Sequence, residues 1–424
     1  MLLVGAATET ITPAIGLDLE GYLRDGPSIA VLDELTCQAV VFDDESTQLV
    51  IAVCDLIGLT RQLRELICDR LELPPEQVML TATHTHCGPA HLASPHHRDV
   101  VAGLADRVAA AINGAIAARR PAHLFTGSVP VPGISGNRRD PAGPLDETAT
   151  FLTAYPATDD VSDAIATIVN FACHPTIQGA ETRGYSADFP GAARRAVAEL
   201  CGGQALYLQG TAGDANPVRT ERTGAEARRT GAILGSAVAG AVLTTVRAAA
   251  GPGVSNPSLG STRPVELAKH GNPVEPAALA ARWADVPVEA RPQPPIEEIR
   301  AAKAAATDPA VIMEWGVREY LALRTAFDSF DFPGPRATLP VQVFRLGAGL
   351  TVAGLPGEPF TVTGKRTREA GDGTVLVAGY ANEAAGYLPT EDEFARSGYE
   401  VGCSMYAPGT VERLTAAAIK LIND

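Results

Sequence analysis

Residues 78–89 read VMLTATHTHCGP and combine an apolar run, two histidines and a turn. The pattern of residues 78–82 is typical of a strand, and the Gly88-Pro89 pair marks a turn after it. His84 and His86 lie between, and residues two apart in an extended backbone point to the same face. Because α/β proteins bind ligands outside the carboxyl ends of strands, we expect both imidazoles to face a ligand there.

Two interpretations of the pair formed by His84 and His86 stay open at this point. Neutral imidazole is the commonest metal ligand in proteins, so the pair predicts a metal site. Histidines at a strand end also hydrogen-bond to loop backbone in the absence of any metal. The motif is short, and by itself it does not separate the two interpretations.

The composition of the 424-residue chain excludes several classes of protein. Hydrophobic residues make up 46% and charged residues 20%, which indicates a globular protein. A net charge of −15 disfavours binding to nucleic acid and to anionic membrane surfaces. We recognise no cleavable leader and no membrane-spanning run, and the seven scattered cysteines include no Cys-x-x-Cys pair. We therefore expect a cytoplasmic protein that binds neither nucleic acid nor membrane.

Strand and helix patterns alternate along most of the chain, which is typical of a layered α/β architecture. Residues 97–120, for example, carry apolar side chains at helical spacing between two strand patterns. Residues 252–335 differ, because they are rich in Ala, Pro and charged residues, with helical patterns at 296–306 and 310–327. We predict a mixed β-sheet core flanked by helices in one domain over 1–424, with 252–335 as an inserted helical subdomain or cap.

Three further residues stand at positions where a metal ligand is expected. His174 and Glu358 each follow an apolar run and precede proline, and Tyr387 lies in a later glycine-containing loop. Two histidines, a glutamate and a further oxygen donor suit a borderline cation such as zinc. Simpler interpretations stay open for each: a buried hydrogen-bonding histidine, an acid at a helix N-terminus and a packed aromatic ring.

Five segments resemble, in this order, successive motifs of the neutral/alkaline (non-lysosomal) ceramidase family. They are THTHCGP at 83–89, NFACHPT at 170–176, GDANP at 213–217, LPGEPF at 355–360 and Gly386-Tyr387. The resemblance extends from ATETITP at 7–13 to Tyr399-Glu400, which is nearly the whole chain. It implies a single ceramidase-like catalytic domain that acts as a zinc amidase.

The resemblance also implies a role for each matching residue. The positions that match the family's Zn²⁺ ligands are His84, His174, Glu358 and Tyr387. His86 matches a histidine beside the metal or the substrate, Arg138 an arginine that reaches the substrate, and Tyr399 a tyrosine that lines the site. The resemblance gives the cysteines no ligand role.

Asn216 is the main departure from the family pattern, because the ceramidases carry a serine there that is proposed as a nucleophile. An amide does not act as a nucleophile, so water is favoured as the attacking group and Asn216 is left as a hydrogen-bond donor. We also expect neither the C-terminal β-sandwich domain of the ceramidases nor the signal peptide of the secreted ones. These differences favour a substrate other than ceramide.

The sequence therefore predicts a zinc-dependent hydrolase that uses metal-activated water to cleave an amide bond, or an ester or lactone bond, of a small soluble substrate. Arg138 suits a carboxylate or another anion on that substrate as one option. Two alternatives stay open: a zinc enzyme that forms an intramolecular amide or ring in a biosynthetic pathway, and a metal-binding protein without turnover. The absence of the serine nucleophile favours both alternatives.

Overall fold

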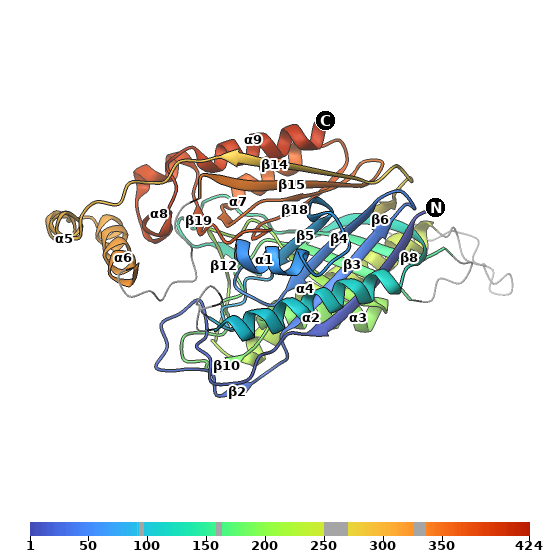
Figure 1. The fold of residues 1–424 in the computed structure, drawn as a ribbon, viewed down its shortest axis with the longest axis horizontal. Helices are drawn as coiled ribbons and strands as arrows, with labels where there is room; N and C mark the ends of the chain where they lie inside the picture. Colours follow the sequence, from blue (N-terminus) through green and yellow to red (C-terminus); the bar gives the residue numbers. More distant parts are fainter. Residues whose placement is uncertain (91, 93–96, 158–162, 250–269, 326–335) are drawn as a thin grey trace, which may run out of the picture.

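Two β-sheets pack face to face, and helices cover the outer face of each, so the chain forms four layers (Figure 1). The computed structural model describes residues 1–90, 92, 97–157, 163–249, 270–325 and 336–424. The arrangement confirms the predicted mixed-sheet core flanked by helices.

The larger sheet has nine strands, in the order β11-β9-β8-β6-β1-β3-β4-β5, with β13 paired to β6 off this path. Its strands are β1 (Leu3–Thr10), β3 (Thr36–Asp43), β4 (Gln48–Cys54), β5 (Val78–Ala82), β6 (Arg120–Pro130), β8 (Thr148–Pro156), β9 (Ala166–Phe171), β11 (Gln204–Gln209) and β13 (Gly271–Pro273). The pairs β4–β5 and β9–β11 are parallel. The two ends of the sheet approach each other, since the Gln209 amide donates to the Thr83 carbonyl over 3.3 Å.

The smaller sheet has four strands in the order β14-β15-β16-β18. They are β14 (Ala280–Pro287), β15 (Thr338–Gly347), β16 (Leu350–Gly354) and β18 (Thr374–Ala378). Apolar side chains from both sheets fill the space between them, among them Phe42, Ile51, Met79, Leu152, Ile168, Leu206, Phe344, Val352 and Leu376. Burial of this surface is the main force that holds the two sheets together.

Helices cover the outer faces of the two sheets. On the larger sheet these are α1 (Arg61–Cys68), α2 (Arg98–Ala117), α3 (Asp188–Cys201) and α4 (Gly224–Ala249), and on the smaller sheet α7 (Thr361–Glu369) and α9 (Thr410–Asn423). All but α7 bury apolar residues against the sheets, whereas α7 buries threonines and a glycine. Among the described residues, α2 and α4 are long and apolar enough to cross a membrane, although no membrane-spanning run was expected from the sequence. This is weak evidence for a membrane, because both helices pack on the sheet.

Short elements surround the ends of the strands. They are β2 (Ala30–Val31) with β10 (Gly184–Tyr185), β7 (Ser135–Asn137) with β12 (Ala215–Pro217), β17 (Glu358–Pro359) with β19 (Tyr387–Leu388), the helix α8 (Tyr399–Cys403) and the 3₁₀ turns η1 (Pro75–Gln77) and η4 (Glu391–Arg396). The β7–β12 and β17–β19 pairs carry residues of the predicted site.

The predicted helical subdomain at 252–335 needs a correction. Two helices are present, α5 (Ile296–Ala305) and α6 (Pro309–Thr325), close to the ranges expected. The same range also contains β13 and β14, and β14 is an edge strand of the smaller sheet. Residues 252–269 and 326–335 lie outside the described residues, and the domain boundaries stay a prediction.

Candidate active site

The loop after β5 brings His84 and His86 together through a turn. The Thr83 N–H donates to the Cys54 carbonyl and the His84 N–H to the Leu56 carbonyl, both over 2.9 Å. His84 has a φ of +66°, a left-handed conformation that is uncommon for residues other than glycine. The expected extended backbone is therefore wrong, yet the two Nε2 atoms still face each other at 3.4 Å.

The other predicted ligands reach the same point from strand ends of both sheets. His174 follows β9 of the larger sheet, and its N–H donates to the Ala215 carbonyl over 2.9 Å. Glu358 follows β16 of the smaller sheet and pairs directly with Tyr387 in the parallel β17–β19 bridge. The site thus lies where the two sheets meet at one end of the molecule.

Hydrogen bonds fix the tautomer of two of the histidines. The Nδ1 atoms of His84 and His174 lie 2.6 Å from the backbone carbonyls of Ile57 and Ala212. A carbonyl only accepts, so each Nδ1 carries the hydrogen of a neutral ring and each Nε2 presents a lone pair. These two Nε2 atoms are 3.1 Å apart.

A carboxylate oxygen completes the cluster. The Oε2 atom of Glu358 lies 3.1 Å from the Nε2 atom of His174 and 3.3 Å from that of His84. Three acceptor atoms therefore converge with no shared hydrogen between them. His84, His86 and His174 also form a buried group whose ligand atoms lie within 4.8 Å of one another. Lone pairs gathered in this way fit a metal cation.

Burial and nearby positive charge lower the pKa values of two of the site's histidines, His86 and His174. The pKa of His174 falls to about 4, chiefly because burial removes water from the ring and because the Arg138 charge is near. Burial and the neighbouring rings of His84 and His174 lower the pKa of His86 well below its usual value. Burial alone would raise the pKa of Glu358, but the two imidazoles more than offset this and lower it. Neutral imidazoles and an ionised carboxylate are the forms that bind metals.

Tyr387 lies at the edge of the cluster as a protonated phenol. Its hydroxyl is 3.5 Å from the Nε2 atom of His174, and burial raises its pKa well above the usual value. The two rings stack with centroids 6.2 Å apart. Tyr387 is therefore placed to donate a hydrogen bond beside the cluster or to act as an additional oxygen ligand.

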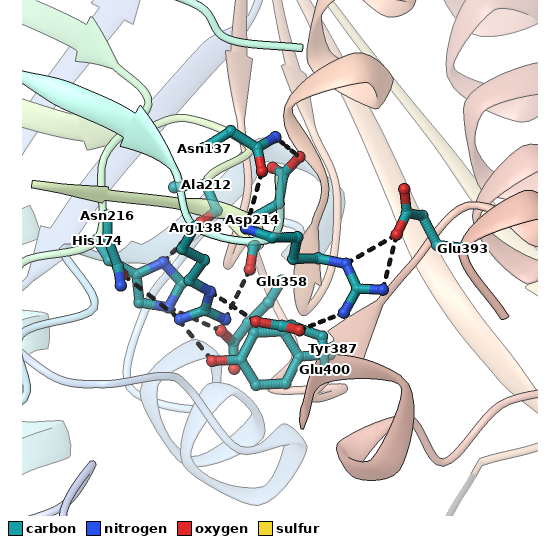
Figure 2. Close-up of polar contacts among 12 residues, drawn as sticks. Asn137, Arg138, His174, Ala212, Asp214, Asn216, Glu358, Tyr387, Glu393 and Glu400 are labelled. Atoms are coloured by element: carbon teal, nitrogen blue, oxygen red, sulfur yellow. Dashed lines mark hydrogen bonds and ion pairs between the residues drawn. The ribbon is translucent and has the colours of Figure 1, made fainter. Parts of the chain in front are cut away.

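Arg138 and Asn216 lie next to Tyr387 (Figure 2), and together with Tyr399 they form the wall beside it. The Arg138 guanidinium lies 5.1 Å from the centre of the Tyr387 ring and 5.9 Å from that of Tyr399. Its Nη1 group donates to the Asn216 Oδ1 atom over 3.5 Å, and its Nη2 group to the Gly213 carbonyl over 2.8 Å. All eight residues predicted from the sequence thus lie in one region, while their roles stay predictions.

Three residues that contact this site were not identified from the sequence. The Tyr380 ring centre lies 4.2 Å from that of His84, and the Tyr22 ring centre 5.0 Å from that of His86. Glu400 pairs with Arg138. Tyr22 and Tyr380 come from loops without periodic spacing, so no pattern pointed to them. Glu400 follows Tyr399 directly, and that adjacency was the available signal.

Sequence comparison connects part of the chain to known proteins, although no family model matches it. Neutral ceramidase of Pseudomonas aeruginosa is 37% identical over 87 residues, which cover 19% of this chain and 13% of that protein. Neutral ceramidase 3 of Arabidopsis thaliana is 32% identical over 97 residues, which cover 20% of this chain and 13% of that protein. Most of each relative therefore lies outside the match.

Solved structures extend the likeness to the whole fold. The crystal structure of neutral ceramidase from Pseudomonas aeruginosa matches with a TM-score of 0.74 and 20% identity, over 99% of this chain and 73% of that one. A structure of ceramidase complexed with C2 matches with a TM-score of 0.71 and 20% identity, over 100% of this chain and 74% of that one. The chain is thus similar in sequence to the neutral ceramidases over about a fifth of its length, and it has the neutral ceramidase fold.

Proposed function

We propose that this protein is a zinc-dependent hydrolase that cleaves an amide bond, or an ester or lactone bond, of a small substrate. The observation that carries the proposal is the convergence of the His84 and His174 Nε2 atoms and the Glu358 Oε2 atom within 3.1 to 3.3 Å. Three nitrogen and oxygen donors with a further phenol at the edge suit zinc better than a hard cation, which prefers oxygen alone.

His84, His174, Glu358 and Tyr387 would hold the ion. Zinc in such a site polarises a carbonyl group and lowers the pKa of water to about 7, which supplies a nucleophile near neutral pH. The two backbone carbonyls on the Nδ1 atoms keep the His84 and His174 rings in the orientation that this requires.

The remaining residues handle the substrate and its protons. Among the residues that the structure describes, the Nδ1 atom of the buried His86 has no hydrogen-bond partner, which supports a role in moving a proton between the attacking water and the leaving group. The Tyr387 hydroxyl is positioned to donate to the oxygen on which negative charge develops. Arg138 and Tyr399 contact the substrate from the adjoining wall. Asn216 has no nucleophilic atom, so water attacks the substrate directly and no acyl-enzyme forms.

The partners and the location are proposals on weaker grounds. The substrate is a small molecule, and the charge of −15 supports the absence of nucleic-acid and membrane partners. The seven cysteines are all free, and six of them are buried. A set of reduced thiols of this kind supports a cytoplasmic location.

A metal and substrate survey tests the function. The purified protein should contain about one zinc ion per chain by elemental analysis. A panel of N-acyl amides, esters and lactones is then incubated with the protein, with and without a chelator, and the products are identified by mass spectrometry. Pairs of products whose masses add up to the substrate plus one water, or for a lactone a single product heavier by one water, support the hydrolase if they disappear with chelator and return with added zinc. Products lighter by one water would identify the ring-forming enzyme, and bound zinc without any turnover would identify the non-catalytic protein.

A further inference from the structure

One carboxylate, that of Glu400, joins two consecutive arginines beside the site. Its Oε1 atom lies 2.7 Å from the Arg138 Nε atom, and its Oε2 atom lies 2.5 Å from the Arg139 Nη1 atom (Figure 2). Glu400 is only 4% exposed. The buried carboxylate attracts both guanidinium groups, each through an oxygen atom of its own, with a hydrogen bond from Arg139 and an ion pair to Arg138.

The charge of Arg138 is therefore already matched within the protein. Arg139 also pairs with Glu393, whose Oε2 atom lies 2.7 Å from the Arg139 Nη2 atom and 2.8 Å from its Nε atom. Glu393 also pairs with Arg396, which pairs in turn with Asp140, so the connected group contains three arginines and three carboxylates. The guanidinium that faces Tyr387 thus offers hydrogen-bond donors to a ligand without an unmatched positive charge.

The packing of α8 against α6 fixes the position of Glu400. Glu400 lies in α8, and a side chain added at Gly402 would come within 2.9 Å of the Glu314 carbonyl in α6, so the two helices pack closely. Arg291 connects them, donating to the Val401 carbonyl and to the Glu314 carboxylate, both over 2.5 Å. The helical part of the predicted cap therefore supports the element that holds Arg138.

We propose that Glu400 is a positioning residue that sets the substrate class: it directs Arg138 toward Tyr387 and cancels its charge, so that the substrate group beside Arg138 is an uncharged carbonyl or hydroxyl. A substrate carboxylate at this point would lie close to the Glu400 carboxylate. Like charges brought together at an interface repel each other, so a neutral group is selected over an anion of the same shape. The proposal rests on the proposed function for the identity of the site, and it replaces the anionic option for the substrate.

Two ligands of equal shape test this by their binding, under conditions in which mass spectrometry finds the amide intact. Hexanamide and hexanoate are titrated calorimetrically into the zinc-loaded protein, and the ratio of their dissociation constants is the readout. Both ligands contact the metal in every variant, so a change in the ratio of their dissociation constants reflects the residues around Arg138. In Glu400→Gln we expect the ratio to move by about tenfold or more toward hexanoate, because a repulsive charge is removed.

Matched variants separate the effect of the carboxylate beside Arg138 from the effect of removing any one negative charge nearby. Glu393→Gln removes a carboxylate that contacts Arg139 and not Arg138, so the ratio should stay within about twofold of the wild-type value. Arg138→Met should move the ratio the other way, toward hexanamide, and provides a second measurement if Glu400→Gln does not fold. With a neutral N-acyl substrate, Glu400→Gln should lower kcat/KM about tenfold through KM, at unchanged zinc content.

The results that overturn the proposal are defined by the same titrations. They are an unchanged ratio in Glu400→Gln, an equal shift in Glu393→Gln, or a wild-type protein that binds neither ligand. A wild-type protein that shows the expected ratios but hydrolyses nothing would overturn the proposed hydrolase and leave the role of Glu400 in selecting a neutral ligand supported.

Discussion

The Nε2 atoms of His84 and His174 lie 3.1 Å apart while the Nδ1 atom of each ring is held on a backbone carbonyl. Two lone pairs at this distance repel each other unless a cation lies between them. Both rings are buried, with exposed fractions of 3% and 0%, so water is poorly placed to relieve the repulsion. The geometry therefore connects the stability of this end of the fold to occupation by a metal.

Replacing either histidine should remove the metal. We expect His174→Ala to lower the zinc content from about one ion per chain to near zero, because the remaining donors no longer surround the ion. The measurement is elemental analysis after gel filtration, with circular dichroism to check the fold. His123→Ala is the matched control, since His123 is an exposed histidine on β6. Equal zinc in His174→Ala and the control would contradict the assignment of His174 as a ligand.

Because Gly21 has no side chain, the His86 ring fits against its backbone. A Cβ atom at Gly21 would come within 2.4 Å of the His86 Nδ1 atom, and Gly21 has a φ of +93°. We expect Gly21→Ala to keep its zinc but to lose activity by about a hundredfold, the effect of displacing a catalytic group by roughly 1 Å. The readouts are zinc content and kcat.

A second glycine in the same loop is a close control for this change. Gly16 has a φ of +107°, and a Cβ atom there would meet no atom within 4 Å. Gly16→Ala therefore introduces the same kind of backbone strain, about 1 to 2 kcal/mol, without touching His86. If Gly16→Ala loses as much activity as Gly21→Ala, loop strain rather than contact with His86 is the cause.

The convergence of the candidate residues was easier to expect from the sequence than the elements that support them. His84, His174 and Glu358 were candidates because each lies just after an apolar run that marks a strand, and the resemblance to the ceramidases joined them into one site. The left-handed backbone of His84 was not predictable, because it depends on hydrogen bonds to residues 54 and 56, which are distant in sequence. A pattern reports local periodicity, whereas tertiary hydrogen bonds decide such conformations.

The segment 252–335 illustrates the same limit for secondary structure. β14 reads AARWADVP, which lacks the run of β-branched and aromatic residues that usually marks a strand. It pairs with β15 alone, at the edge of the sheet, and much of it is only half-buried. A strand in this setting follows the backbone of its neighbour, so the fold rather than its own side chains determines it.

Asp188 should make stability depend on pH. Burial raises its pKa from 3.8 to about 6, although the N–H groups of Gln178 and Phe189 donate to it and oppose the shift. Its contribution is fully present below the unfolded pKa near 4 and is lost as the pH rises through about 6. A shift of about two units corresponds to about 3 kcal/mol of unfolding free energy.

The variant Asp188→Asn checks the predicted direction of the pH dependence, because an amide does not titrate. Urea unfolding of the metal-free proteins is measured at several pH values between 4 and 7. Relative to the wild type, the variant should gain up to about 3 kcal/mol of stability over this range, whatever its absolute stability. A difference that stays constant with pH would mean that Asp188 titrates normally in the folded protein.

The buried pair of Arg194 and Asp55 supports the loop that carries His84 and His86. Asp55 is completely buried, and its Oδ1 and Oδ2 atoms each accept from Arg194 over 2.7 Å. Oδ1 also accepts the hydroxyl of Thr83, the residue before His84, over 3.1 Å. Removing the arginine leaves an unmatched buried charge, so Arg194→Met should lower the unfolding free energy by about 3 to 5 kcal/mol.

An exposed pair in the same chain sets the scale for that loss. Arg300 pairs with Glu319 over 2.8 Å, but its side chain is 55% exposed, so Arg300→Met should cost about 0 to 1 kcal/mol. Urea unfolding of the metal-free proteins compares the two variants. Because the Asp55 carboxylate also positions Thr83, Arg194→Met should weaken zinc binding as well, whereas Arg300→Met should leave it unchanged. Equal losses of stability in both variants would show that the Asp55 carboxylate does not depend on Arg194, and the loop would then be fixed by its backbone hydrogen bonds alone.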